Sequence, residues 1–476
     1  MASKIPMGDM VVILPGIMGS VLQKDGKDLW AISGTALWDG LLDREGFAER
    51  LQLKEDDPIA ADLGDGIKAV RLFEDAMIVP GFMKIDGYTQ TAQMITQNFD
   101  VVEGDIYRDA WDKPANFYRF PYDWRRDNRA NARILKDLLD RRLACWRSRS
   151  GNPQAKLIRD GPQYGGLGCA RYYLEVLGGW RDAKALFTFG TPYRGALVAV
   201  DSLSNDYKKR FLDLRAAMRS MTSIYQLLPI YEVIKIGDRY HRVAEVEKLP
   251  NIDRAKAQNA LAFHREIETA VTENLKDPAY AGFSTMPIVG IQQETYQSAE
   301  LVNGELKLSY DLPAVLKNRP DLVDGDGTVP QVSAIPIELS KSLKNNFIAE
   351  KHAAIQNQKQ VLENLREGIS LSQFSLDAVR AAQGAISLSL EDLYLADEPI
   401  QLRARLMGSA ALGNASLTAE ITSIADGKAI AVPFVQGEEN RWELAIELPA
   451  GQYRVAVSTE DEAVATPVHD LFEVLR

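Results

Sequence analysis

Short apolar runs that end at glycine or proline constrain the fold of this chain more than any other feature. Residues 11–14 read VVIL and end at Pro-Gly, and residues 185–189 end at Gly-Thr-Pro. Continuous apolar runs of this length are typical of strands that are buried on both faces of a parallel sheet. Similar runs at 116–122 and 286–291 alternate with helical stretches such as 131–142. The pattern predicts an α/β fold with a mostly parallel sheet.

The pattern of apolar and polar residues changes after about Ser370. Short alternating runs separated by turn residues follow, at 386–390, 401–405, 416–421, 441–448 and 453–457. Strands at this spacing predict a small β-sandwich, and the phrase LPAGQYRVAV resembles the closing strands of bacterial Ig-like modules. A chain of 476 residues is also longer than one usual domain. We therefore expect an α/β domain at 1–370 and a sandwich at 380–476, the latter for stability or spacing.

Composition excludes several classes of protein. The net charge of −11 argues against a nucleic-acid partner, which normally requires a basic face. The two cysteines, Cys145 and Cys169, exclude a disulfide scaffold. The first residues lack the apolar core of a signal peptide, and no stretch is long enough to span a bilayer. We expect a cytoplasmic protein, with export by a route without a cleaved signal left open.

An acidic turn and a histidine suggest part of a hydrolase triad. The turn is Gly325-Asp326-Gly327-Thr328-Val329-Pro330, and His352 follows downstream. Of the four histidines, only His352 follows this acid within the first domain, as the order nucleophile, acid, histidine requires. Asp324 and Asp326 compete for the role of the acid that orients His352, which would act as the base at the start of a helix. The other aspartate would shape the turn, and the ligands of a full Ca²⁺ loop are absent.

The nucleophile is missing from its expected place. Turn 15–20, which reads PGIMGS after the first apolar run, can direct the Ile17 N–H at a developing oxyanion. Downstream of this turn a Gly-x-Ser-x-Gly elbow is expected before the Gly-Thr-Pro turn. No serine lies between Ser150 and Ser202, and residues 157–173 read LIRDGPQYGGLGCARYY.

Seven motifs together resemble the lecithin:cholesterol acyltransferase-like lipases, which include the lysosomal phospholipase A2 branch. They occur in the family's order over about residues 9–366: VVILPGIMGS, FYRFPYDWRRDNRANA, GGL…ARYYLEVLGGW, FGTPYRGA, SIYQLLPIY, DGDGTVP and KHAAI. The resemblance implies an α/β-hydrolase fold with a helical cap and no cofactor or metal. It points to Asp326 as the acid, and it places the family's nucleophilic serine at Gln163, with Tyr164 supplying the second oxyanion N–H.

The departure at the elbow has a possible origin in the reading frame. In the family this segment reads like GHSMGGLVARYY. Synonymous codons for residues 159–169 can be written so that dropping one nucleotide gives ATGHSMGGLVA, which runs into Arg171-Tyr172-Tyr173. The serine codon then overlaps Gln163 and the start of Tyr164. We hypothesise a local frame error, or a compensated natural frameshift, over about Arg159 to Ala170.

Two alternatives stay open at the elbow. The chain as written can be a pseudoenzyme that lacks a nucleophile. Cys169 is a second candidate, but Leu167 and Arg171 stand where a tight elbow requires small residues.

Two insertions are predicted to cover the site. Residues 27–43 contain Trp30 and Trp38, which either form a lid over an apolar substrate or pack in a core. Residues 201–275 are predicted to form a largely helical cap above the catalytic edge. Within that cap Tyr225, Leu227 and Leu228 either line an acyl groove or simply pack.

The expected function is that of a lipid ester hydrolase or O-acyltransferase. Its partner would be a lipid or other ester, with peripheral membrane contact left open, and the oligomeric state is not predicted. The alternative is a catalytically inactive lipid-binding or scaffolding protein.

Overall fold

The computed structural model describes residues 4–30, 44–74, 77–79, 83–162, 166–205, 208–209, 212–340, 347–370, 384–408, 416–437, 441–460 and 465–475. A seven-stranded sheet forms its centre, in the order β20-β17-β12-β11-β2-β10-β9. Every neighbouring pair in this sheet is parallel. The strands are β2 (Met10–Ile13), β9 (Glu103–Asp105), β10 (Phe117–Arg119), β11 (Leu157–Pro162), β12 (Ala183–Phe189), β17 (Ser284–Gly290) and β20 (Phe347–Ile348). The predicted parallel α/β sheet is confirmed.

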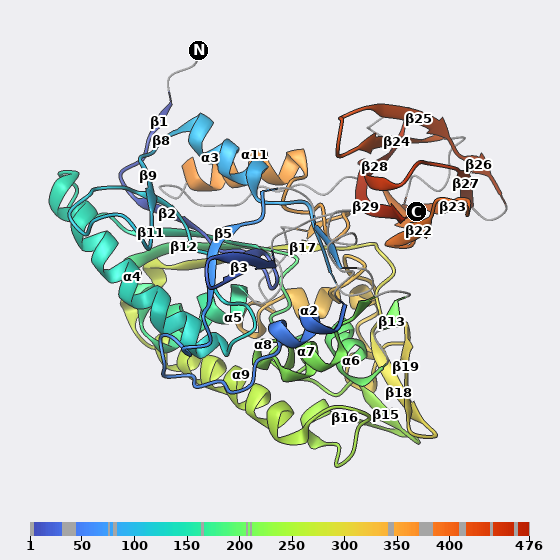
Figure 1. Ribbon diagram of the computed structural model, residues 1–476, viewed down its shortest axis with the longest axis horizontal. Helices are drawn as coiled ribbons and strands as arrows, with labels where there is room; N and C mark the ends of the chain where they lie inside the picture. The colour runs from blue at the N-terminus through green and yellow to red at the C-terminus, as the bar shows by residue number, and fades with distance from the viewer. Residues whose placement is uncertain are drawn as a thin grey trace.

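Helices cover both faces of this sheet. Figure 1 shows α3 (Thr89–Asn98) and α11 (Lys359–Ser370) on one side, and α4 (Asn128–Arg149) and α9 (Arg254–Asn274) on the other. The two long helices start at capping aspartates: the Asp127 side chain accepts from the Arg129 N–H, and that of Asp253 from the Lys256 N–H. Covering helices explain why β2 is buried along its whole length.

The predicted cap at 201–275 is only partly helical. It contains the end of α6 (Leu197–Ser204) and the whole of α7 (Arg215–Ser220), α8 (Thr222–Tyr225) and α9. It also contains a hairpin of β15 (Ile234–Ile236) and β16 (Arg239–His241). That hairpin joins β18 (Ser298–Val302) and β19 (Glu305–Ser309) in a four-stranded sheet. The helical prediction failed there because the stabilising partner strands lie some 60 residues downstream and cannot be recognised locally.

The first insertion starts as a strand rather than as an irregular loop. Three antiparallel strands form a sheet in the order β4-β3-β5, and α2 (Arg44–Leu51) lies between β4 and β5 in the chain. They are β3 (Ser20–Lys24), β4 (Lys27–Trp30) and β5 (Ile67–Leu72). Trp38 and the rest of 31–43 lie outside the described residues.

The C-terminal residues form two mainly antiparallel sheets, shown in orange and red in Figure 1. One contains β21 (Gly384–Ser389), β23 (Ile400–Gly408), β27 (Arg441–Ile446) and β26 (Val435–Gln436). The other contains β22 (Leu393–Leu395), β29 (Val468–Leu475), β28 (Gly451–Thr459), β24 (Leu417–Ser423) and β25 (Ala429–Pro433). Their buried apolar side chains form a cluster separate from that of the parallel sheet. A sandwich-like β region therefore follows the α/β region.

Candidate active site

The predicted site residues follow strands that end at the same edge of the parallel sheet. Turn 15–20 follows β2, Gln163 follows β11, Gly190 follows β12, and Asp326 and His352 lie beyond the ends of β17 and β20. Ligands of open α/β sheets bind outside this carboxyl edge. The topology therefore brings together residues that are more than 300 positions apart in the chain.

Asp326 and His352 form a buried hydrogen-bonded pair. The distance between Asp326 Oδ2 and His352 Nδ1 is 2.7 Å, and the two residues are 1% and 3% exposed. The main-chain N–H of His352 also donates to the carbonyl of Asp326 at 2.9 Å. Two hydrogen bonds between the same residues fix both the imidazole orientation and the separation of the two turns. The predicted proximity of acid and histidine is present in the structure.

The carboxylate is oriented by its own turn. Asp326 Oδ1 accepts hydrogen bonds from the N–H groups of Thr328 and Val329, at 3.0 and 2.7 Å. These bonds leave Oδ2 for His352. The Thr-Val of the acidic turn therefore supplies backbone donors for the carboxylate, a local arrangement typical of aspartate.

One detail of the prediction was wrong. His352 does not begin a helix: it lies in a turn, and α11 begins only at Lys359. The turn is held by tertiary hydrogen bonds, among them Gln356 Nε2 donating to the Gly87 carbonyl at 2.7 Å. Such a bond to a distant loop has no signature in the local sequence.

Two glycines allow the strands to approach this pair. A Cβ on Gly190, whose φ is +53°, would lie 2.5 Å from Asp326 Oδ2 and 3.1 Å from His352 Nδ1. A Cβ on Gly290 would lie 2.4 Å from the Cβ of Asp326. Any side chain at either position would displace the acid. The Gly-Thr-Pro turn therefore forms the floor under the acid–histidine pair.

Turn 15–20, the predicted oxyanion turn, is held by two aromatic side chains. The Gly16 N–H donates to Tyr88 Oη at 2.8 Å, and Trp30 Nε1–H donates to the Met18 carbonyl at 3.1 Å. Met18 has φ +59°, a left-handed conformation that is uncommon for a side chain other than glycine. Ile17 lies between these anchors and is 1% exposed. The main chain of this turn is therefore fixed in one conformation.

Trp30 is a core residue and not part of a lid. It is 1% exposed at the end of β4, and its ring packs edge-on against Trp124 at 5.3 Å. Of the two alternatives considered for Trp30, the structure therefore favours packing. The lid interpretation failed because a tryptophan followed by residues of loop-like sequence gives no indication of which side chains pack behind it.

The predicted nucleophile position lies between β11 and α5 (Gly166–Arg171). Gln163 and Tyr164 themselves lie outside the described residues. A Cβ on Gly166 would lie 2.2 Å from the carbonyl oxygen of Pro15, so the start of α5 touches turn 15–20 directly. A strand followed closely by a helix, here β11 and then α5, is the order in which a nucleophile elbow occurs. Cys169, the alternative nucleophile, is fully buried within α5.

The predicted cap side chains are buried. Tyr225, Leu227 and Leu228 are 2%, 4% and 4% exposed, and all three belong to the main hydrophobic cluster. The Leu227 carbonyl accepts from the Ala196 N–H at 2.9 Å, which ties this segment to the chain after the Gly-Thr-Pro turn. These contacts favour packing over an acyl groove, the two roles considered for the segment.

The acid–histidine pair lines a cavity of about 210 Å³. Tyr296, just before β18, and Leu308 of β19 form another part of its wall. The C-terminal region contributes Leu390, Asp392 and Asp470. The wall formed by C-terminal residues was not predicted from the sequence.

Three ionisable groups near the turns are either ion-paired or have raised pKa values. Asp123 binds the guanidinium of buried Arg125 at 2.6 Å in a charge-assisted link. Burial, and to a lesser degree Cys169 and Tyr88, raises the pKa of Tyr122 well above its ordinary value, so that its phenol is neutral. Burial also raises the pKa of Asp324, whose main-chain carbonyl accepts from Gln331 within the acidic turn.

His264 and His469 have structural partners. Burial lowers the pKa of His264 to about 4, and its Nε2 lies 2.8 Å from the Gln226 carbonyl, so this ring is neutral near pH 7. His469 in β29 binds Glu350, two residues before His352, at 2.8 Å. Within the described ranges, no group of three or more His, Cys, Asp or Glu side chains is arranged to hold a metal ion.

Comparisons with known proteins do not assign a family. No protein-family model matches the chain, and no curated protein does. A Bacillus licheniformis lipase in its propeptide form is similar over 98% of this chain and 93% of its own, with 10% identity and a TM-score of 0.35. An alpha-2-macroglobulin mutant from Salmonella matches 22% of this chain and 7% of its own, with 23% identity and a TM-score of 0.18. The CARDB domain of a Pyrococcus furiosus protein, in complex with di-metal ions, matches 19% and 92%, with 13% identity and a TM-score of 0.14.

These identities and TM-scores establish neither a family nor a function for this chain. Among the described helices, none is both long and apolar enough to cross a bilayer.

Proposed function

We propose that this protein is an α/β-hydrolase that cleaves or transfers the acyl group of a lipid ester through a Ser-Asp-His triad. The observation that carries the proposal is the buried hydrogen bond between Asp326 and His352 at the carboxyl edge of the parallel sheet. A histidine oriented by a buried carboxylate beside a strand–turn–helix elbow is the constellation that activates a serine. No cofactor is required for this chemistry.

The acid and the histidine have distinct tasks in the reaction. The serine Oγ attacks the ester carbonyl carbon while His352 Nε2 takes the Oγ proton. The carbonyl–oxygen bond to the alcohol then breaks, and His352 returns the proton to the leaving alkoxide. Asp326 remains ionised, accepts the hydrogen bond from His352 Nδ1–H and stabilises the imidazolium. Water or a second alcohol attacks the acyl-enzyme and returns a proton to the serine through His352.

The oxyanion would be held by two backbone donors. They are the N–H of Ile17 and the N–H of position 164, which follows the nucleophile. The contact of Gly166 with Pro15 supports this assignment, because it brings the elbow and turn 15–20 together. Donors in comparable sites contribute about 3–4 kcal/mol each to the transition state.

The serine itself is proposed to be encoded at position 163 in the shifted frame. The chain as written has Gln163 there, and an amide is not a useful nucleophile. The restored segment ATGHSMGGLVA would supply the glycines that the elbow requires two positions before and after the serine. Its glycine after Met-Gly would coincide with Gly166, whose contact with Pro15 tolerates no side chain.

The substrate class rests on the resemblance to lecithin:cholesterol acyltransferase-like lipases. A phospholipid or another lipid ester is proposed, reached in the cytoplasm or by peripheral contact with a membrane surface. Water and alcohol are both candidate acyl acceptors.

Two measurements test the proposal. Resequencing the gene around codon 163 decides the frame hypothesis, which fails if the genomic frame encodes Gln163-Tyr164 without nearby compensating insertions or deletions. Protein from the native gene should then react with a fluorophosphonate probe. We expect His352→Ala to slow this labelling about 1,000-fold or more, because the serine loses its base.

The second candidate is a catalytically inactive lipid-binding or scaffolding protein. The lack of any serine between Ser150 and Ser202 favours it. A folded native-gene product that does not react with the probe would support this role and exclude the esterase.

A further inference from the structure

The C-terminal β-sandwich contacts the acid and histidine turns through two buried polar side chains. Gln293 and Glu350 belong to the α/β region, and both are 0% exposed. Each lies next to a member of the pair and reaches the main chain of the sandwich. The two contacts come from different turns and end on different strands, so they are independent.

Gln293 links the acidic turn to β21. Its main chain exchanges two hydrogen bonds with Gly325, the residue before Asp326, at 3.0 and 3.1 Å. Its side-chain Nε2 donates to the Ile386 carbonyl at 3.0 Å, and its Oε1 accepts from the Leu388 N–H at 3.1 Å. The side chain therefore pairs with β21 as another strand would.

Glu350 links the histidine turn to β29. Its Oε1 accepts from the main-chain N–H of His469 at 2.8 Å, and its Oε2 lies 2.8 Å from His469 Nδ1. The same Oε1 accepts from the N–H of Lys351, which directly precedes His352. The carboxylate therefore joins β29 to the backbone that carries the proposed base.

Apolar contact and the cavity wall extend this junction. Leu471 of β29 packs with Ala353, the residue after His352. Leu390, Asp392 and Asp470 line the cavity that contains the acid–histidine pair.

Without the sandwich, Gln293 and Glu350 would lose the hydrogen bonds that they make to β21 and β29. The loss of hydrogen bonds by a buried amide or carboxylate is unfavourable, most of all when the group is charged. The two turns would then relax toward water, and a displacement of about 1 Å is enough to reduce catalysis about 100-fold. The conformation of the pair therefore depends on the second domain.

We propose that the β-sandwich is part of the active site: Gln293 and Glu350 are positioning residues that hold Asp326 and His352 in register, and Leu390, Asp392 and Asp470 shape the substrate cavity. This inference rests on the proposed esterase function. It replaces the role of stability or spacing that we expected for this domain.

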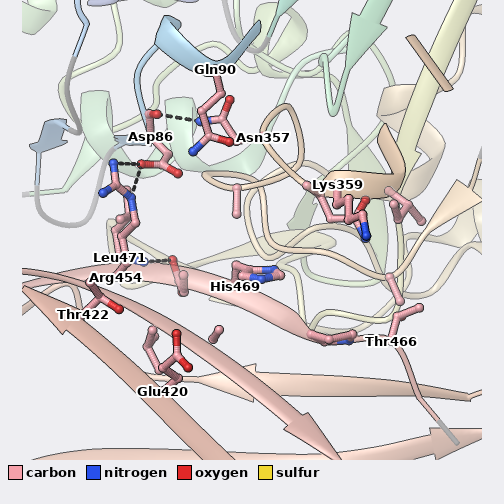
Figure 2. A pocket seen from close by; sticks show the side chains of 18 of the residues that line it. Asp86, Gln90, Asn357, Lys359, Glu420, Thr422, Arg454, Thr466, His469 and Leu471 are labelled. Carbon is pink, nitrogen blue, oxygen red and sulfur yellow. Dashed lines mark hydrogen bonds and ion pairs between the residues drawn. The ribbon is translucent and has the colours of Figure 1, made fainter. Parts of the chain in front are cut away.

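A further polar contact between the two regions, away from Gln293 and Glu350, provides a matched control. Figure 2 shows Arg454 of β28 bound to Asp86, and the distance between Arg454 Nη2 and Asp86 Oδ1 is 2.7 Å. The two side chains line a larger cavity of about 720 Å³ between the regions, and neither lines the one that contains His352. Asp86 also meets the histidine turn, because its main-chain carbonyl accepts from Asn357 Nδ2 at 2.6 Å. Arg454→Met removes only the partner of the Asp86 side chain, so it weakens the same interface and leaves this main-chain bond in place.

The test observes His352 directly in the full chain. Only four histidines are present, so ¹³C/¹⁵N-histidine labelling gives few NMR signals, which His→Gln variants assign. The measured quantity is the chemical shift of the His352 Nδ1 proton. Wild type, Glu350→Ala, Glu350→Gln and Arg454→Met are compared, with folding checked by thermal unfolding.

We expect Glu350→Ala to move the chemical shift of the His352 Nδ1 proton or to abolish its signal, because the Lys351 N–H that precedes the ring loses its carboxylate acceptor. Glu350→Gln keeps an oxygen for the His469 N–H and should give a smaller change, whereas Arg454→Met should give none. The proposal is overturned if folded Glu350→Ala leaves His352 unchanged, or if Arg454→Met changes it equally. If Glu350→Ala does not fold, the comparison of Glu350→Gln with Arg454→Met decides by the same criterion.

Kinetics separate this inference from the proposed function. In a native-gene product that reacts with the probe, Glu350→Ala should lower kcat about 100-fold with little change in KM. If that product is inert, the esterase proposal fails, while the NMR comparison still reports whether the sandwich positions His352.

Discussion

At the scale of single residues, Gly190 sets the distance between the sheet and the acid–histidine pair. Two features require glycine at this position. Its φ of +53° is a left-handed conformation, and an added Cβ would lie only 2.5 Å from Asp326 Oδ2. Gly237 provides a matched comparison, because its φ is +58° and a Cβ there would meet nothing within 4 Å.

We expect Gly237→Ala to lower the free energy of unfolding by about 1–2 kcal/mol, the cost of the left-handed conformation. Gly190→Ala should cost a further ~1–3 kcal/mol for the steric overlap and should also change the NMR signals of the His352 ring. Chemical denaturation and histidine NMR measure the two effects. Equal destabilisation by the two variants would show that the acid can move away from Gly190 without cost.

At the scale of elements, turn 15–20 depends on a strand that lies outside it. Trp30 at the end of β4 donates to the Met18 carbonyl, and this bond supports the left-handed Met18 backbone. Trp180 is a suitable reference: it is 2% exposed, and its Nε1–H has no hydrogen-bond partner among the described residues.

Trp30→Phe should therefore destabilise the protein by about 1–3 kcal/mol more than Trp180→Phe, because it leaves the Met18 carbonyl unsatisfied in the core. In a reactive native-gene product it should also slow fluorophosphonate labelling. Thermal unfolding and labelling rates test this expectation. If the two variants were equally stable and equally reactive, Trp30 would have no part in shaping the turn.

At the scale of the whole molecule, the contact between the two regions should respond to pH. Burial lowers the pKa of His469, but its hydrogen bond to Glu350 and the charges of Glu350 and Asp86 outweigh burial, and the net pKa is raised. The facing groups are thus Glu350 after β20 and Asp86 before α3, the latter also bound to Arg454 of β28. A raised folded pKa means that protonated His469 stabilises the folded state.

This contribution is fully present below the unfolded pKa of about 6.5 and is lost as the pH rises through the raised folded value. The difference in unfolding free energy between wild type and His469→Gln should therefore shrink as the pH increases across that window. Denaturation at several pH values measures it, with His241→Gln in β16 as the reference. A constant or growing difference would contradict the assigned charge state.

Local sequence was sufficient to predict the parallel sheet, the β-rich C-terminal region and the meeting of Asp326 with His352. Strand runs, turn glycines and the acidic turn are local patterns. They can be recognised in the sequence because they follow from the side-chain periodicity and the backbone preferences of neighbouring residues. Long-range packing was needed to establish that Trp30 lies in the core, that part of the cap is a β-sheet, and that Gln293 and Glu350 reach the sandwich. Those outcomes depend on partners such as His469, which lies 119 residues from Glu350, and only packing of the complete chain brings such groups within hydrogen-bonding distance.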